Sequence, residues 1–330
     1  MKSYIKLDPK EPEITCEKIK KAMRNQDLKV DTIKNIVKIY YAKPRHSRQL
    51  LAADSGFNNA YETPFTVFKS AVVDDEIRIE SVDNICLFHG QNYSTDRLKR
   101  LLMQIILYEA IAKKVKTNSK NSLILVDGTI TLSVFNPTSK DSKEYRKHFK
   151  DFVEELYSPL LADCIKQDVF LLGFLKRTGS TFLAHQMGVS GLYDIYIMNN
   201  LLKIHDSYIP PVPVLGSFFP SRLASQNYIT FYLNLKGWNY RFELIEQQKD
   251  GYLECIENLL HWATNAHYGM NPIFSKADEN ARVTKRDANT WFNHVLADLP
   301  EENQSKLRLE ARKKTHFGYG SRSLIRGLTK

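Results

Sequence analysis

The chain has 330 residues, of which 43% are hydrophobic and 11% aromatic. That composition excludes a disordered chain and is sufficient for one large domain or two modest ones. The net charge of +10 and the pI near 9.2 favour polyanionic partners such as nucleic acid.

The four cysteines lie far apart and form no CxxC pair, which suits reduced thiols better than a zinc site or a disulfide framework. The first residues lack the apolar run of a signal peptide. No stretch approaches the roughly 18 apolar residues that a membrane helix needs. We therefore expect a soluble, cytoplasmic protein with no membrane partner.

Residues 1–46 are polar and rich in lysine, and two amphipathic helices are predicted there, over Ile14–Arg24 and Leu28–Tyr41. We predict that this N-terminal helical arm packs against its own domain. A contact in a dimer is the alternative.

The segment from Gln49 to Ile130 holds the strongest pattern. It predicts the order strand, strand, strand, helix, strand, over Leu50–Ala53, Phe65–Val73, Ile77–Phe88, Ser94–Lys116 and Leu123–Val126. The first strand ends on Asp54-Ser55-Gly56 and the last on Asp127-Gly128-Thr129. On the helix, the apolar face that begins at Leu98 places Glu109 where an apolar residue is expected.

This order is that of a ribonuclease-H-like sheet, in which the first and fourth strands are neighbours. We expect Asp54 and Asp127 to meet there and Glu109 to join them from the helix. Converging carboxylates need a cation, and hard oxygen ligands select Mg²⁺ or Mn²⁺. Two such ions about 4 Å apart can activate a water and stabilise the leaving oxygen of a phosphodiester. The alternatives are ordinary turns for the two aspartates and a salt bridge at the rim for Glu109.

The C-terminal half predicts further elements of the same domain. They are a helix over Asp141–Ile165, a buried strand over Val169–Leu175, a hairpin over Tyr228–Leu235 and Tyr240–Ile245, and helices over Tyr252–Ala266, Ile273–Ala281 and Lys285–Leu299. Thr284 and Asp287 resemble a capping box for the last helix. The buried strand exits into Lys176, Arg177 and Ser180, which suit phosphate contacts or a charged turn that caps a helix. The tail after Ser305 is strongly basic, as expected for a segment that binds nucleic acid or a partner, or for a solvated end.

These motifs together resemble the NurA nucleases. The resemblance rests on the Leu-Ala-Ala-Asp-Ser-Gly strand end, the helical glutamate and the Leu-Val-Asp-Gly-Thr strand end, followed by three later segments: Gly173–Ser180, Tyr240–Leu244 and Gly269–Ala281. It covers about residues 49–295. The first turn departs from the family order Asp-Gly-Ser, and Asp278 stands where the family has a metal-binding histidine; His267 and His316 are the other candidates for that ligand.

The resemblance implies an α/β fold, with a ribonuclease-H-like mixed sheet flanked by helices. The predicted boundaries are an N-terminal arm over 1–46, a nuclease domain over 47–303 and a basic tail over 304–330. It implies a homodimeric DNA nuclease that cuts single strands and resects ends with a hexameric HerA-type ATPase. The implied catalytic residues and ligands for Mn²⁺ or Mg²⁺ are Asp54, Glu109, Asp127 and Asp278, and the implied DNA contacts are Lys176, Arg177 and Ser180. The chain has no Walker A motif, so translocation would come from the partner.

Two rival functions use the same topology. Actin-like and sugar-kinase phosphotransferases have Asp-Gly-Thr turns like the one at Asp127, but they do not need the helical glutamate. A catalytically inactive DNA-binding adaptor is the other rival. Binding of a metal without ATP favours the nuclease over the kinase, and binding without cleavage favours the adaptor.

Overall fold

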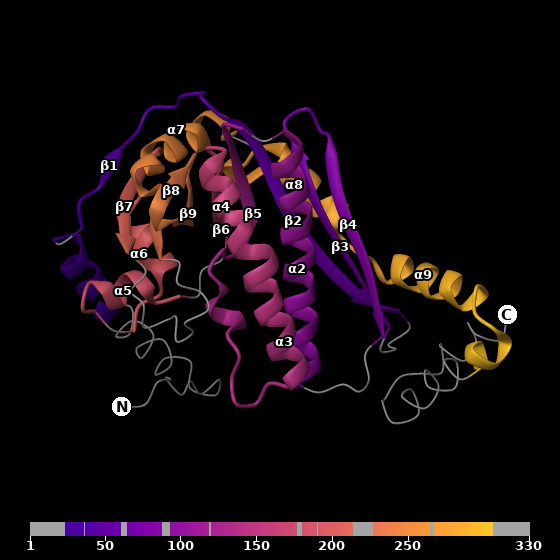
Figure 1. Cartoon of the computed structure of the whole chain (residues 1–330). Coiled ribbons are helices and arrows are strands. Elements are labelled where there is room, and N and C mark those ends of the chain that lie inside the picture. The colour runs from indigo at the N-terminus through magenta and orange to yellow at the C-terminus, as the bar shows by residue number, and fades with distance from the viewer. Residues whose placement is uncertain are drawn as a thin grey trace.

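The computed structural model describes residues 24–35, 37–60, 65–87, 93–118, 120–176, 180–189, 191–213, 227–264 and 267–305. These residues build one mixed β-sheet with helices on both faces (Figure 1). Its described strands lie in the order β1-β7-β8-β9-β6-β5-β2-β3-β4.

The strands are β1 (Tyr40–Tyr41), β2 (Gln49–Asn59), β3 (Phe65–Asp74), β4 (Ile79–Leu87), β5 (Ser122–Asp127), β6 (Phe170–Leu175), β7 (Ser207–Pro213), β8 (Tyr228–Leu235) and β9 (Trp238–Ile245). The α-helices are α2 (Tyr93–Asn118), α3 (Lys143–Asp151), α4 (Ser158–Lys166), α5 (Phe182–Gln186), α6 (Asp194–Leu201), α7 (Tyr252–Trp262), α8 (Pro272–Ala281) and α9 (Lys285–Ala297). A π-helical segment, η3 (Phe152–Tyr157), joins α3 to α4 without a break, so the predicted long helix is present.

The centre of the sheet is parallel. β2 pairs with β5 from Gln49↔Ser122 to Ala53↔Val126, and β5 pairs with β6 in the same sense. These strands are buried on both faces, which explains their nearly continuous apolar runs. The predicted neighbourhood of the first and fourth strands is confirmed.

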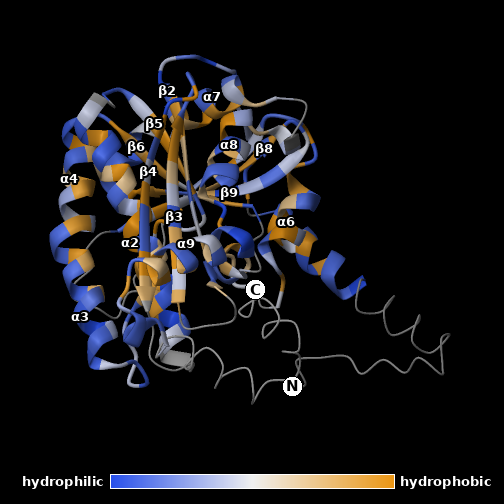
Figure 2. Cartoon of the chain, turned by 90° about the vertical axis from the view of Figure 1, so that its right-hand side faces the viewer, coloured by the Kyte–Doolittle hydropathy of each residue, from blue (hydrophilic) through white to orange (hydrophobic). Residues whose placement is uncertain are grey.

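The two faces of the sheet carry separate cores. Leu51, Ala53 and Val126 pack with α2, α3 and α4, whereas Ala52 and Leu125 pack with α7 and α8. Figure 2 shows α2, α3 and α4 on one side of the strands and α7 and α8 on the other. Because strand side chains alternate, the parity of a residue on β2 or β5 fixes the helical layer that it faces.

Three elements differ from the sequence predictions. The helix predicted over 28–41 ends near residue 35, and Tyr40 and Tyr41 form the edge strand β1 against β7. The described part of this arm packs against its own domain, since Val30 and Ile33 are buried in a core with α5 and α6. β2 continues through the predicted turn to Asn59, because β3 pairs with it along its whole length.

Other predictions lie partly or wholly outside the described residues, notably the helix over 14–24 and the basic tail from residue 306. The capping box of α9 is confirmed: the Thr284 side chain accepts from the Asp287 backbone N–H, and the Asp287 carboxylate accepts from that of Thr284. None of the helices within the described ranges is both long and apolar enough to cross a membrane.

Candidate active site

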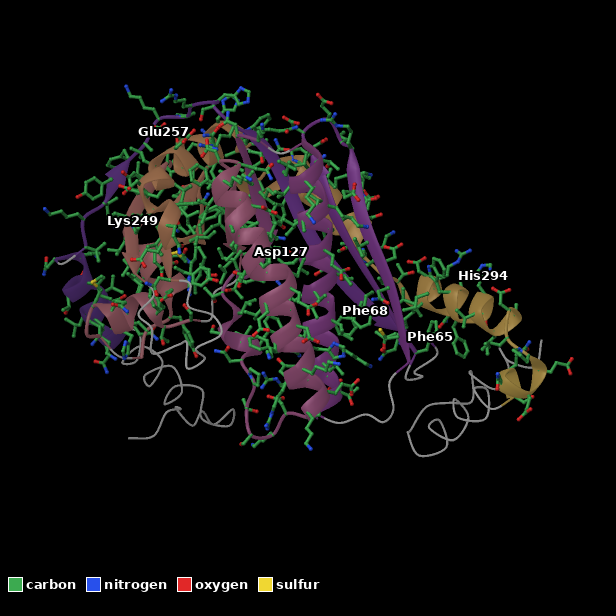
Figure 3. The ribbon with its side chains drawn as sticks, viewed as in Figure 1. Phe65, Phe68, Asp127, Lys249, Glu257 and His294 are labelled. Atoms are coloured by element: carbon green, nitrogen blue, oxygen red, sulfur yellow. The ribbon has the colours of Figure 1, made fainter. Side chains whose placement is uncertain are left out.

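Asp54 and Asp127 lie side by side at the centre of the sheet. The β2–β5 register ends at Ala53↔Val126, so the two aspartates are the next residues of neighbouring strands, whose spacing is about 4.8 Å. Asp54 comes two residues after Ala52, and Asp127 comes two residues after Leu125. Because alternate side chains of a strand point to the same face, both aspartates face the layer of α7 and α8. Figure 3 labels Asp127 in the central part of the molecule.

The turn after β5 is held tightly against β6. Gly128 adopts φ +106°, and its N–H donates to the Phe174 carbonyl at 2.9 Å. A Cβ at Gly173 would approach Ile130 N to 2.9 Å and Gly128 O to 3.0 Å. Glycine at these two positions lets the chain turn immediately after Asp127 and holds the carboxylate at the strand end.

The Asp54 carboxyl group is in an unfavourable environment for a negative charge. Burial raises its pKa from 3.8 to about 7, and the charge of Asp127 adds to the rise. The backbone N–H of Ser55, 2.7 Å from Oδ1, and the charge of Lys176 oppose it, while Asp278 raises it further. Two neighbouring carboxylates that resist joint ionisation form a site that a cation would stabilise.

Lys176 supplies a positive charge at this place. Its Nζ donates to Asp127 Oδ2 at 2.8 Å and lies 4.3 Å from the centre of the Phe274 ring on α8. Asp278 follows Phe274 by one helical turn and is exposed. The lysine predicted to contact DNA is therefore beside the predicted metal ligands.

Close backbone contact keeps α8 on β2. A Cβ at Gly56 would lie 2.8 Å from the carbonyl oxygen of Ala281, the last residue of α8. The Asn58 side chain donates to Val283 O at 3.2 Å, and the Asn271 side chain caps the start of the helix by accepting from Ile273 N at 3.0 Å. These contacts place Asp278 on the aspartate side of the sheet.

Glu109 is separated from this group. It lies half-buried on α2, which packs on the opposite face of the sheet against Leu51, Ala53 and Val126. Burial raises the pKa of Glu109, and the charge that acts on it is that of Lys113 on the same helix rather than an aspartate. The predicted convergence of Glu109 with Asp54 and Asp127 is wrong, because the sheet lies between Glu109 and the aspartates. Its role as a ligand remains a sequence prediction.

Within the described ranges, no three histidine, cysteine or carboxylate side chains lie close enough to hold one metal ion by themselves. The pair of aspartates nevertheless fits a hard divalent cation. Mg²⁺ is commonly bound by one or two carboxylates together with water and substrate phosphate. Here an ammonium group already neutralises one carboxylate, and the other ionises with difficulty. Asp54 and Asp127 are therefore suitable ligands, with Asp278 facing them from α8.

The remaining predicted residues have different outcomes. Ser180 does not point its hydroxyl to a DNA surface in this structure: Oγ donates to buried Asp194 and accepts from Arg241 Nη1 at 2.9 Å. Arg177 and His316 lie outside the described residues, as does the side chain of His267.

A buried network behind the site was not assigned a role from the sequence. Glu243 on β9 accepts from Thr129 Oγ1 at 2.5 Å and from Ile130 N at 3.1 Å, which fixes the turn after Asp127. Arg241 Nη2 donates to Glu243 at 2.9 Å, and the arginine also reaches Ser180. The available signal was the alternation of an arginine and a glutamate on one face of an otherwise apolar strand, which indicates a buried ion pair.

The fold and site together define a ribonuclease-H-like α/β protein with paired aspartates on its central parallel strands. The NurA domain model matches residues 48–283, which is more than half of the chain. The chain belongs to the NurA family.

Solved structures agree with this fold. The NurA nuclease of Sulfolobus solfataricus is similar, with a TM-score of 0.61 and 17% identity over 89% of this chain and 98% of that one. A NurA bound to dAMP and manganese gives a TM-score of 0.61 at 10% identity, over 91% and 99% of the two chains. A NurA with manganese gives 0.57 at 13% identity, over 88% and 99%. No curated protein sequence matches the chain.

Proposed function

We propose that the protein is a metal-dependent DNA nuclease whose site is formed by Asp54 and Asp127. The observation that carries the proposal is the placement of the two aspartates on adjacent parallel strands, facing the same side of the sheet, with Lys176 paired to Asp127. Membership of the NurA family supports it, as do the manganese-containing structures of similar fold.

In this proposal the two aspartates bind Mn²⁺ or Mg²⁺, and exposed Asp278 serves as a further ligand directly or through water. When bound, such ions stabilise the charge that develops during phosphodiester hydrolysis, and two of them can act on the attacking and leaving oxygens. With a cation held by the aspartates, Lys176 would contact the phosphate of the strand in place of Asp127. The turn fixed by Gly128 and Glu243 keeps Asp127 in place during the reaction.

The partners of the protein belong to the same proposal. A second copy of the chain would form a homodimer, and a hexameric HerA-type ATPase would feed DNA to it for end resection, as the resemblance implies. Light scattering after size-exclusion chromatography tests the dimer. Cleavage with and without the ATPase and ATP tests the second partnership.

The decisive experiment is cleavage of labelled single- and double-stranded DNA with Mn²⁺ or Mg²⁺. Asp127→Asn should slow cleavage by roughly 10²–10³-fold, because the loss of a metal ligand forfeits several kcal/mol of transition-state stabilisation. Asp31→Asn is the matched control, since Asp31 pairs with Lys34 on the exposed face of the N-terminal helix. Equal cleavage by the Asp127→Asn variant and the wild type would refute the site.

The separation of Glu109 favours one second candidate, a DNA-binding adaptor without nuclease activity. An adaptor would bind DNA and Mn²⁺ but would not cut under any of these conditions, with the ATPase present or absent. A Glu109→Gln variant provides a further test: unchanged cleavage would leave the aspartates as the working ligands.

A further inference from the structure

A hollow of about 740 Å³ opens directly beside the proposed site. Its volume lies within the range of about 300–1,000 Å³ that is typical of small-ligand sites. Lys176 and Asp278 line it, so it is continuous with the carboxylates. Five of its other lining residues are aromatic: Phe174, Trp238, Tyr240, Tyr268 and Phe274.

Two of these aromatic side chains are exposed at the hollow. Trp238 is 48% exposed and Tyr268 is 66% exposed, although large aromatic side chains are usually covered. Their rings meet edge to face, with centroids 4.7 Å apart and an interplanar angle of 81°. The pair therefore leaves exposed aromatic surface at the hollow, on which a flat ligand can stack.

The backbone around Tyr268 is held in an unfavourable conformation. Tyr268 adopts φ +57° and ψ +36°, the left-handed region that non-glycine residues rarely occupy. The Tyr240 hydroxyl donates to the Tyr268 carbonyl at 2.5 Å. Gly269 follows at φ +74°, where a Cβ would lie 2.3 Å from Leu235 O. The neighbouring hairpin thus fixes the exposed tyrosine in position.

The boundary between the hollow and the carboxylates is charged. The Lys176 ammonium lies 4.3 Å from the centre of the Phe274 ring and 2.8 Å from Asp127 Oδ2. A phosphate held at this lysine would leave an attached sugar and base within reach of the aromatic wall. On the α6 side, the Asn239 side chain donates to Asn199 Oδ1 at 3.0 Å, which places two amides at the rim.

We infer that this hollow holds an unpaired base of the DNA strand whose phosphate lies at Lys176. The inference rests on the proposed function and adds a base-binding subsite to it: a base engaged in a duplex cannot stack in the hollow, so the nucleotide held there is unpaired. Stacking on aromatic rings tolerates all four bases, so the hollow selects unpaired over paired nucleotides rather than one sequence.

The experiment is a binding measurement on the full chain without divalent metal, which prevents cleavage. Fluorescence anisotropy compares a labelled thymidine oligonucleotide with an abasic strand of the same length and charge. The wild type should bind the thymidine strand more tightly. Trp238→Ala and Tyr268→Ala should each weaken that binding by roughly 5- to 150-fold while affecting the abasic strand little.

Two control variants separate stacking from general damage. Tyr268→Phe keeps the ring and should retain wild-type binding. Tyr41→Ala removes a tyrosine of similar exposure, 59%, from the distant edge strand β1 and should change nothing. Circular dichroism and thermal unfolding confirm that each variant is folded.

The fluorescence of Trp238 gives a second readout. The chain has three tryptophans, so a variant carrying Trp262→Phe and Trp291→Phe leaves Trp238 as the reporter. The thymidine strand should quench its emission and the abasic strand should not. Equal binding of the two strands by the wild type, with no selective quenching, would overturn the inference.

Failure of this inference and failure of the proposed function give different results. Cleavage that depends on Asp127 without any base preference refutes the stacking site and leaves the nuclease. A base preference that depends on Trp238 and Tyr268 in a protein that never cleaves refutes the nuclease and leaves the stacking site.

Discussion

Replacement of Asp54 by asparagine should remove activity and yet stabilise the metal-free protein near neutral pH. Asp54 is 9% exposed, and its pKa is raised from 3.8 to about 7 by burial and by Asp127. When the pKa of a carboxyl group is higher in the folded chain than in the unfolded chain, the group stabilises the fold. This stabilisation is complete at pH values below the pKa of the unfolded chain. That contribution is lost as the pH rises through its folded pKa.

The magnitude follows from the shift. About three pKa units at about 1.36 kcal/mol each correspond to roughly 4 kcal/mol at most, of which about 2.5 kcal/mol is lost between pH 5 and pH 8. Asparagine retains the oxygen that accepts from the Ser55 N–H and carries no charge. The Asp54→Asn variant should therefore exceed the wild type in stability by about 1.5 kcal/mol near pH 5 and by about 4 kcal/mol near pH 8.

The assay is urea unfolding in EDTA at both pH values, with Asp31→Asn as the surface control. In a matching buffer without EDTA, Mn²⁺ should stabilise the wild type, by about 2.7 kcal/mol at a hundredfold excess over the dissociation constant, and should not stabilise the Asp54→Asn variant. A difference between the wild type and the variant that is the same at both pH values would refute this account of the site. So would a variant that is the less stable protein near pH 8.

Three further substitutions test the surroundings of the aspartates. The Lys176→Met variant should bind Mn²⁺ up to about fivefold more tightly, as measured by calorimetry, because a partly exposed ammonium no longer competes for Asp127. It should also cleave DNA more slowly. Weaker Mn²⁺ binding by this variant would contradict the assignment. Glu243→Ala should lower the free energy of unfolding in urea by about 3–5 kcal/mol, because Arg241 loses its closest acidic partner in a buried network. Combining it with Arg241→Ala should cost less than the sum of the single losses, and simple additivity would argue against coupling. Gly56→Ala should cost about 1–3 kcal/mol and reduce cleavage, because its Cβ would displace the end of α8. Gly188→Ala meets no atom within 4 Å and should leave the cleavage rate unchanged, despite strain of about 1 kcal/mol from its positive φ.

Local patterns predicted most of the elements. The apolar runs of β2, β5 and β6, the helical period of α2 and the Lys236-Gly237 turn of the hairpin all depend on residues close together in the chain. The same is true of the α9 capping box. The adjacency of β2 and β5 could also be predicted, because a parallel crossover through a helix restricts strand order.

Long-range contacts decided what local patterns could not. Tyr40 and Tyr41 lie in a helical pattern, but they pair with β7 at the sheet edge. The sequence around Ser180 is typical of a turn, but the Ser180 hydroxyl forms hydrogen bonds with Asp194 and Arg241, which come from other elements. Burial and hydrogen bonding with partners far along the chain override local preference at such positions.

By itself, the sequence determined the family, the order of the elements and the position of the paired aspartates, because each follows from residue type and short-range spacing. The tertiary structure decided which carboxylates share a face. Strand parity places Asp54 and Asp127 toward α8, while α2 carries Glu109 to the other side of the sheet. When both faces of a sheet are apolar, an amphipathic helix can pack on either one. The periodicity of the helix therefore cannot specify which face it covers.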